Sequence, residues 1–214
     1  MENYITIIGG GLAGCEAAYQ VSKRGIKVKL YEMKPEKFSP AHSNENLAEV
    51  VCSNSFKSNL LTNACGLLKE ELRMLDSLLI RIADEVAVPA GQALAVDREV
   101  FAKRVTEELE KDENIEIIRK EFGSNGENLI QESENGIVIV ATGPLSSNII
   151  SDQIAQITGQ DKLYFYDAAA PIISKESINF DIAFWGDRYS RRKEKRWNYW
   201  RMEKKIVTRR EKLY

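Results

Sequence analysis

The sequence predicts an α/β fold in which helices cover a doubly wound, parallel sheet. First, a β-branched run at 4–8 ends in a glycine-rich stretch at 9–14. Second, helix-forming residues at 15–24 stop at a glycine and lead into an alternating, strand-like run at 26–32. Third, a near-continuous Val and Ile run lies within 136–143, which is typical of a fully buried parallel strand. Together the first two observations predict one βαβ unit, and the later strand is expected beside its glycine turn.

The segment between these elements is expected to be mixed. Residues 35–58 have no sustained period and carry Pro, Ser and Asn, which indicates a loop with one helical turn at 47–51. An amphipathic helix is expected over 67–79, with four leucines on one face. Asp97 is expected to cap a second helix at 98–111. The four leucines are Leu68, Leu72, Leu75 and Leu79, and the other strand candidates are 115–119, 163–166 and 182–185.

The composition is that of an ordinary globular protein. The 214 residues are 43% hydrophobic and 29% charged, which excludes a wholly disordered chain. No window offers the ~20 apolar residues of a membrane helix, and the N-terminus lacks the features of a signal peptide. Three cysteines without CxxC spacing argue against a disulfide framework or a zinc site. We therefore expect a cytoplasmic protein without a metal site or membrane contact.

The net charge of −2 hides a strong asymmetry along the chain. Residues 190–214 carry eleven Lys and Arg against three Glu, whereas the preceding body is acidic. With Trp197, Tyr199 and Trp200, this tail could bind RNA through phosphate contacts and base stacking. The alternatives are a solvated surface helix and a segment that does not belong to the fold.

The glycine stretch has the spacing of a dinucleotide-binding turn between a strand and a helix. Gly9 allows the tight turn, Gly11 lets the backbone approach a pyrophosphate, and Gly14 permits close packing of helix and strand. The helix N-terminus supplies N–H groups and partial positive charge for the phosphates. Glu32 ends the next strand and can accept hydrogen bonds from the ribose hydroxyls of FAD or NAD. The alternative is a glycine turn in another kind of α/β sheet.

A second signal is ATG at 141–143, at the end of the late strand. The carboxyl edge of an open α/β sheet is where ligands bind, so this segment is expected beside the glycine turn. The pairing of the two signals resembles FAD-binding flavoproteins more than plain NAD dehydrogenases. The alternative is a simple strand-ending turn. The predicted cofactor-binding residues are Gly9, Gly10, Gly11, Leu12, Ala13, Gly14, Glu32, Thr142 and Gly143.

One cysteine stands in a context suited to chemistry. Small polar residues follow Cys52, and a helix N-terminus or a nearby cation would lower the pKa of such a thiol. The alternative is that Cys52 is a small buried hydrophobic residue. Cys15 and Cys65 lack this context and are interpreted as structural. His42 is the only histidine and is interpreted as an exposed loop residue rather than a base.

Seven motifs occur in the order found in one family of flavoproteins. From about residue 3 to 189, the chain resembles the folate-dependent tRNA (uracil-5-)-methyltransferases, TrmFO, which are related to the tRNA-modifying flavoproteins MnmG (GidA). The segment at 47–55 discriminates most, because the glycine motif would fit many flavoproteins. The motifs are IIGGGLAG at 7–14, YEM at 31–33, LAEVVCSNS at 47–55, VPAG at 88–91, ALAVDR at 93–98, ATGPL at 141–145 and YFYDA at 164–168.

The resemblance implies a two-domain FAD enzyme. Such enzymes move a methylene group from 5,10-methylenetetrahydrofolate to C5 of the uridine at position 54 in the tRNA T loop. NAD(P)H supplies reducing equivalents. FAD would then be the cofactor, tRNA the partner, and NAD(P)H and the folate the co-substrates. The position matching Cys52 lies near the flavin in that family, which makes Cys52 the expected catalytic residue.

The resemblance also implies a division into domains. Residues 1–150 would form the FAD-binding domain with an inserted segment at about 33–112, and 151–189 would begin an incomplete second domain. Residues 190–214 would lie outside the family fold. Family members continue into a second-cysteine segment that is missing from this sequence, so we expect a truncated or frame-shifted form that is inactive by itself. The alternatives are a non-catalytic nucleotide-binding remnant and an MnmG-type flavoprotein fragment.

Overall fold

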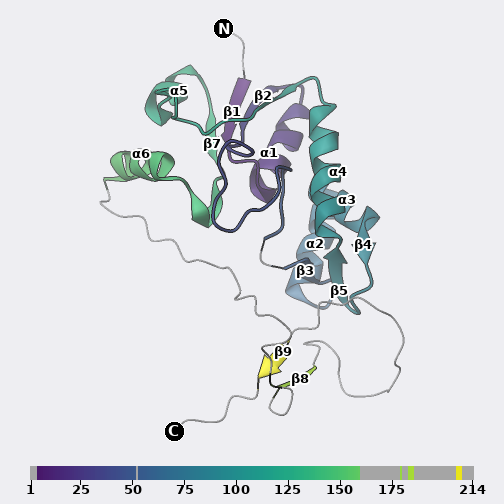
Figure 1. Ribbon diagram of the computed structural model, residues 1–214. Helices are drawn as coiled ribbons and strands as arrows, with labels where there is room; N and C mark the ends of the chain where they lie inside the picture. Colours follow the sequence, from purple (N-terminus) through teal and green to yellow (C-terminus); the bar gives the residue numbers. More distant parts are fainter. Residues whose placement is uncertain (1–3, 52, 160–178, 180–182, 186–205, 209–214) are drawn as a thin grey trace.

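The main sheet has four parallel strands in the order β6-β2-β1-β7 (Figure 1). Ile7 of β1 is in register with Leu30 of β2 and with Ile139 of β7. Ile7 and Leu30 are fully buried, so the inner strands lie at the centre of the core. The strands are β1 (Tyr4–Ile8), β2 (Lys27–Tyr31), β6 (Ile115–Ile118) and β7 (Val138–Val140). The computed structural model describes residues 4–51, 53–159, 179, 183–185 and 206–208.

The strand order reverses beside β1. The chain passes from β1 through α1 (Leu12–Ser22) to β2, and β6 continues on the same side. It then returns to the opposite side of β1, where β7 pairs with 6–8. In open α/β sheets, ligands bind outside the carboxyl ends of the strands at such a reversal. The predicted α/β fold is confirmed, and its topology points to the ends of β1 and β7.

The larger core lies between the sheet and the helices on the α1 side. Helices α3 (Leu78–Glu85) and α4 (Arg98–Glu110) pack against α1 and against each other. Glu16 of α1 accepts hydrogen bonds from the Ser77 hydroxyl and the Leu79 amide, at 2.8 and 3.1 Å. These bonds satisfy groups at the start of α3 and fix its position on α1. The largest fully buried side chains include Phe101, Ile7, Leu30, Leu47, Leu78, Ile82 and Leu109.

A smaller core lies on the side of α5 (Leu129–Asn135) and α6 (Asn148–Thr158). Figure 1 shows these two helices away from α1 and α4, flanking β7. The buried members of this core come from β1, from the segment after β6, and from both helices. They are Ile8, Phe122, Leu129 and Ile150.

A separate antiparallel sheet is inserted between β2 and β6, with strand order β3-β5-β4. It lies at the lower end of α4 in Figure 1. Phe56 of β3 contacts Phe101 of α4 with ring centroids 5.5 Å apart, which joins this sheet to the larger core. The inserted elements are β3 (Ser55–Ser58), α2 (Ala64–Met74), β4 (Ala87–Val88) and β5 (Ala93–Val96).

The helix expected over 67–79 is two helices, so this prediction was wrong. Helix α2 ends at Met74, α3 begins at Leu78, and Asp76 between them has φ 56°. Leu68 is 55% exposed, although leucine periodicity placed it on the buried face.

The reason is that α2 buries a lysine and a glycine instead. The Lys69 ammonium donates to the carbonyls of Phe56 and Cys65, at 2.8 and 2.7 Å. A Cβ on Gly66 would lie 1.9 Å from the Leu60 carbonyl oxygen, so the helix approaches that turn closely. Contacts to backbone groups thus override the hydrophobic period on α2.

Other expectations had mixed outcomes. Asp97 caps α4 as predicted, accepting hydrogen bonds from the Glu99 and Val100 amides, each at 3.2 Å. The helical turn expected at 47–51 is not formed, since the chain makes a turn at 47–48 and has no regular structure at 49–51. Strand β7 is not fully buried, because it has one described neighbour and its Val140 is 40% exposed.

Two of the expected strands lie in the later part of the chain. The strand expected at 182–185 corresponds to β8 (Ala183–Trp185), which pairs antiparallel with β9 (Ile206–Thr208). The strand expected at 163–166 lies outside the described residues. Among the helices that the structure describes, none has the length and apolar character needed to cross a membrane.

Candidate functional site

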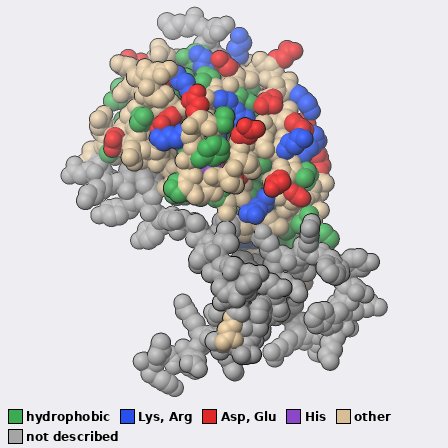
Figure 2. All heavy atoms as spheres, in the orientation of Figure 1, with side chains coloured by type: hydrophobic (Ala, Val, Ile, Leu, Met, Phe, Trp, Pro, Cys, Tyr) green, Lys and Arg blue, Asp and Glu red, His purple; other side chains and the backbone are tan. Residues whose placement is uncertain are grey.

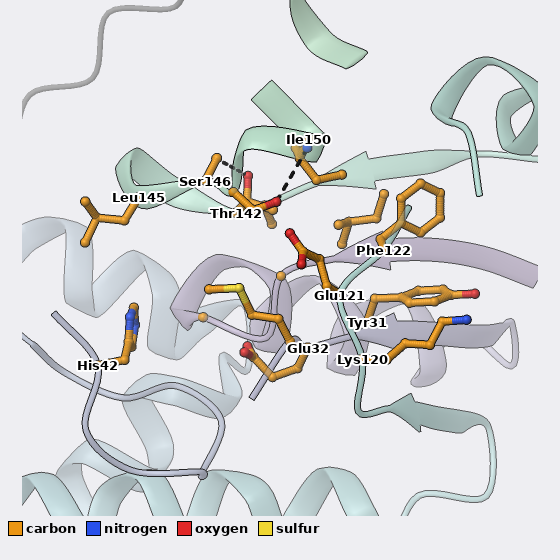
Figure 3. A pocket seen from close by; sticks show the side chains of 16 residues that line it. Tyr31, Glu32, His42, Lys120, Glu121, Phe122, Thr142, Leu145, Ser146 and Ile150 are labelled. Atoms are coloured by element: carbon orange, nitrogen blue, oxygen red, sulfur yellow. Dashed lines mark hydrogen bonds between the residues drawn. The ribbon is translucent and has the colours of Figure 1, made fainter. Parts of the chain in front are cut away.

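A hollow opens at the carboxyl ends of β1, β2, β6 and β7, on the reversal of strand order (Figure 3). The empty space in the hollow and in the open solvent at its mouth is about 590 Å³. Glu32 lies near the middle, with His42 and Leu145 toward one end and Tyr31, Lys120 and Phe122 toward the other. The remaining lining residues are Ile8, Gly9, Gly11, Met33, Glu121, Ala141, Thr142, Ser146, Ser147 and Ile150.

Two glycines of the turn are required by the packing of the chain on itself. Gly9 has φ 107°, and a Cβ there would lie 2.6 Å from the Ala141 carbonyl oxygen. A Cβ on Gly14 would lie 1.8 Å from the Gly9 carbonyl oxygen. The backbone therefore has no room for a side chain at either position, as the motif predicts.

Gly11 differs from both because nothing in the chain explains it. Its φ of −74° is open to any residue, and no atom lies within 4 Å of the Cβ that it lacks. It caps the N-terminus of α1 and lines the hollow. The open space in front of Gly11 is therefore where a ligand would approach the backbone.

Glu32 joins the end of β2 to the glycine turn. Its carboxylate accepts hydrogen bonds from the amides of Gly10 and Lys34, at 3.0 and 2.9 Å, and the residue is only 7% exposed. A carboxylate has about four acceptor positions, so two remain for a partner in the hollow that Glu32 lines. Gly10 itself is hemmed in, since a Cβ there would lie 2.8 Å from Glu32 Oε2.

Hydroxyl groups gather on the β7 side. The Ala141 amide continues the β1–β7 pairing by donating to the Ile8 carbonyl at 2.8 Å. The next residue, Thr142, shares a hydrogen bond of 2.5 Å with the Ser146 hydroxyl. Gly143 follows with φ 66° and starts a short 3-10 helix. This turn brings Thr142 and Ser146 into the lining of the hollow, while Gly143 is not part of that lining.

The end near β6 combines aromatic and charged groups. Tyr31 and Phe122 make an edge-to-face contact with ring centroids 5.1 Å apart. Lys120 forms an ion pair with Glu127. Burial raises the pKa of Glu121, but hydrogen bonds from Lys37 and Ser147 outweigh it and hold that pKa below its usual value. The charged groups at this end are thus paired.

The structure describes two of the three cysteines, Cys15 and Cys65, both of which the sequence indicated to be structural. Cys15 is fully buried, and its thiol contacts the Gly10 carbonyl oxygen at 3.2 Å. Burial raises the pKa of Cys15 to about 12, which removes it as a nucleophile near neutral pH. Cys65 is part-buried in the first turn of α2. Cys52, the expected catalytic residue, lies outside the described residues.

The glycine turn, Glu32 and Thr142 thus meet at one hollow. A comparison with family models places the chain that carries them in a known family. The family model GIDA, glucose inhibited division protein A, matches residues 4–211. The chain belongs to the GIDA family. The match extends into the basic segment at 190–214. It therefore runs past residue 189, where the resemblance to the family was expected to end.

Two similar curated proteins carry the same name. The chain is 55% identical over 191 residues to "Methylenetetrahydrofolate--tRNA-(uracil-5-)-methyltransferase TrmFO" from Acetivibrio thermocellus. It is 54% identical over 191 residues to the protein of that name from Fusobacterium nucleatum. Each alignment covers 89% of this chain and 42% of the relative, so the chain spans less than half the length of these relatives.

A solved GidA structure from Aquifex aeolicus is more distant. It aligns with a TM-score of 0.45 and 18% identity, covering 57% of this chain and 20% of the other.

Sequence reasoning missed part of the hollow of this GIDA-family chain. Residues 120–122 follow the carboxyl end of β6, and the rule that ligands bind at such ends would have found them. His42 comes from a loop that carries no such signal, whereas Leu145 ends the 3-10 helix after β7 and belongs to the motif at 141–145. Leu12 and Ala13 belong to the first turn of α1 and are not among the lining side chains. No described group of His, Cys, Asp or Glu is arranged to hold a metal ion.

Proposed function

We propose that the hollow holds FAD, with the pyrophosphate against Gly11 and the adenosine ribose on Glu32. The observation that carries this proposal is the open space at Gly11. Gly9, Gly10 and Gly14 are confined by neighbouring atoms of the chain, whereas Gly11 is not. A diphosphate in that space would explain why the turn has no side chain there.

The residues around Gly11 fit such a ligand. The first amides of α1 have no partner within the helix, and the helix dipole favours an anion at that end. The acceptor positions left on Glu32 suit two ribose hydroxyls. Bound FAD would supply the redox chemistry, and the protein residues would bind and orient it. Thr142 and Gly143, on the β7 side, are proposed to lie along the same ligand.

For the reaction, we propose FAD-dependent methylation of uridine at C5 in the tRNA T loop. The support is the name shared by relatives that are 50–55% identical over nearly all of this chain. Methylenetetrahydrofolate would be the one-carbon donor, NAD(P)H the reductant, and tRNA the partner, in the cytoplasm. Cys52 is the proposed catalytic residue. Residues 1–150 would form the FAD-binding domain, with 151–189 beginning the second.

The described surface bears on how tRNA would be held. Figure 2 shows Lys and Arg interleaved with Asp and Glu on the face in view. Ion pairs also join opposite charges on the described surface, such as Arg104 with Glu85 and Glu107. Since that face presents no continuous basic patch, we propose that tRNA contacts come largely from elsewhere. The second candidate function is nucleotide binding without catalysis, which the same hollow supports.

Two measurements test these proposals separately. Titration of the purified chain with FAD is expected to show saturable binding, tighter than that of NAD. A chimera in which this chain replaces the aligned part of the Acetivibrio thermocellus relative is expected to transfer label from methylenetetrahydrofolate to tRNA. The same chimera with Cys52→Ala is expected to bind FAD without transferring label. An FAD-loaded chimera that transfers no label would leave nucleotide binding as the function.

A further inference from the structure

His42 is a lining residue that the proposed FAD site does not yet use. It lies on the loop between β2 and β3 and stands at the end of the hollow away from Tyr31 and Phe122 (Figure 3). We infer that His42 binds the ligand, donating a hydrogen bond from Nε2 to a phosphate oxygen of the bound dinucleotide. This inference rests on the proposed function.

The loop that carries His42 is fixed by a buried ion pair. The Lys34 ammonium lies 3.1 Å from Glu49, and their side chains are 3% and 8% exposed. Lys34 also donates to the Asn46 carbonyl at 2.6 Å, while Glu49 accepts from the Ser43 amide at 2.9 Å. These bonds connect both flanks of His42. The ring is therefore held at the hollow before any ligand arrives.

Ser39 is the hydrogen-bond partner of one ring nitrogen of His42. The Ser39 hydroxyl oxygen lies 2.6 Å from His42 Nδ1 and accepts the Ala41 amide at 3.3 Å. The Ser39 hydroxyl can donate its proton to Nδ1 while its oxygen accepts the Ala41 amide, and we infer this arrangement, which places the ring proton on Nε2. Burial lowers the pKa of His42, and the positive charge of Lys34 lowers it further, so the ring is neutral near pH 7. A neutral ring has one N–H, and the tautomer decides which nitrogen can donate to a ligand.

The described lining of the hollow offers a phosphate no unpaired positive charge. With His42 neutral, Lys120 is the one positively charged side chain among the described lining residues, and it is paired with Glu127. Glu32 and Glu121 bring negative charge to the same hollow. The His42 Nε2 group would add a neutral donor to the α1 amides and the β7-side hydroxyls, at the end of the hollow away from Tyr31 and Lys120.

The test compares ligands with and without phosphates. Affinities for FAD, ADP and adenosine are measured by calorimetry for the wild-type chain, His42→Ala, His42→Gln and Lys103→Ala. Lys103→Ala is a control for truncation of a side chain outside the hollow, because Lys103 lies on α4 with its side chain 70% exposed. His42→Ala is expected to weaken ADP and FAD by about tenfold or more, with adenosine changed less than about twofold. His42→Gln, whose amide can still donate, is expected to retain most of the affinity, and Lys103→Ala all of it.

The outcomes separate this inference from the proposed function. Equal ADP affinity in His42→Ala, or equal weakening of ADP and adenosine, would overturn the role of His42 while FAD binding by the wild type stood. A wild-type chain that bound none of the three ligands would overturn both. Thermal unfolding of each variant checks the fold. Should His42→Ala unfold, Ser39→Ala gives a second test, with a smaller loss of ADP affinity expected and no loss contradicting the tautomer argument.

Discussion

At the scale of single residues, the glycine turn combines two different physical requirements. Gly9 and Gly14 are fixed by contacts within the chain, while Gly11 faces open space. The sequence spacing predicted all three positions because the strand–glycine–helix motif fixes them together, although the atoms that confine Gly9 come from Ala141, beyond β7. It could not predict His42, whose place depends on the Lys34–Glu49 ion pair within an irregular loop. Contacts between residues of an irregular loop produce no periodic pattern from which they could be predicted.

Cys15 provides a residue-scale prediction that depends on pH. Burial raises the pKa of its thiol from 9.0 to about 12, so the folded chain keeps the proton where the unfolded chain loses it. The stability that this provides is complete below about pH 9 and is lost as pH rises from 9 toward 12. We expect urea unfolding to become easier across that window, and less steeply so in Cys15→Ala. Parallel pH profiles for the two proteins would contradict the assignment.

At the scale of secondary-structure elements, local signals succeeded where side chains satisfy their own helix. Asp97 caps α4 through amides two and three residues ahead, and this was predictable. Helix α2 was not predictable, because Lys69 turns inward to carbonyls of β3 and of its own first turn. Hydrophobic periodicity ranks leucine above lysine for burial. It has no means of anticipating carbonyl groups that arrive from another element.

The leucines of α2 and α3 should therefore differ in their effect on stability. Leu68 is 55% exposed and Leu78 is fully buried. Leu68→Ala is expected to change the free energy of unfolding by less than about 0.5 kcal/mol. Leu78→Ala is expected to cost about 2–5 kcal/mol, since it leaves a cavity in the larger core. Urea denaturation of both variants measures this difference, and equal losses would show that the predicted continuous helix face is buried after all.

At the scale of the whole molecule, the reversal of strand order beside β1 determines where a ligand can lie. The sequence predicted the ends of β1 and β7 to be neighbours, and their parallel pairing confirms it. It did not predict that the β6 end and the loop between β2 and β3 would complete the hollow, because those contacts depend on how the inserted segment folds back. The activity named for the relatives belongs to chains of which this one covers 42%.

The most direct measurement is the FAD affinity of Gly11→Ala, with Gly14→Ala as its control. The Cβ of an alanine at 11 would have no atom of the chain within 4 Å, so Gly11→Ala is expected to unfold like the wild type. Its FAD affinity is expected to be lower by about tenfold or more, ~1.4 kcal/mol. Gly14→Ala is expected to lose about 3 kcal/mol of folding stability, because its Cβ would lie 1.8 Å from the Gly9 carbonyl oxygen. A folded Gly11→Ala chain that bound FAD as tightly as the wild type would contradict the placement of the pyrophosphate.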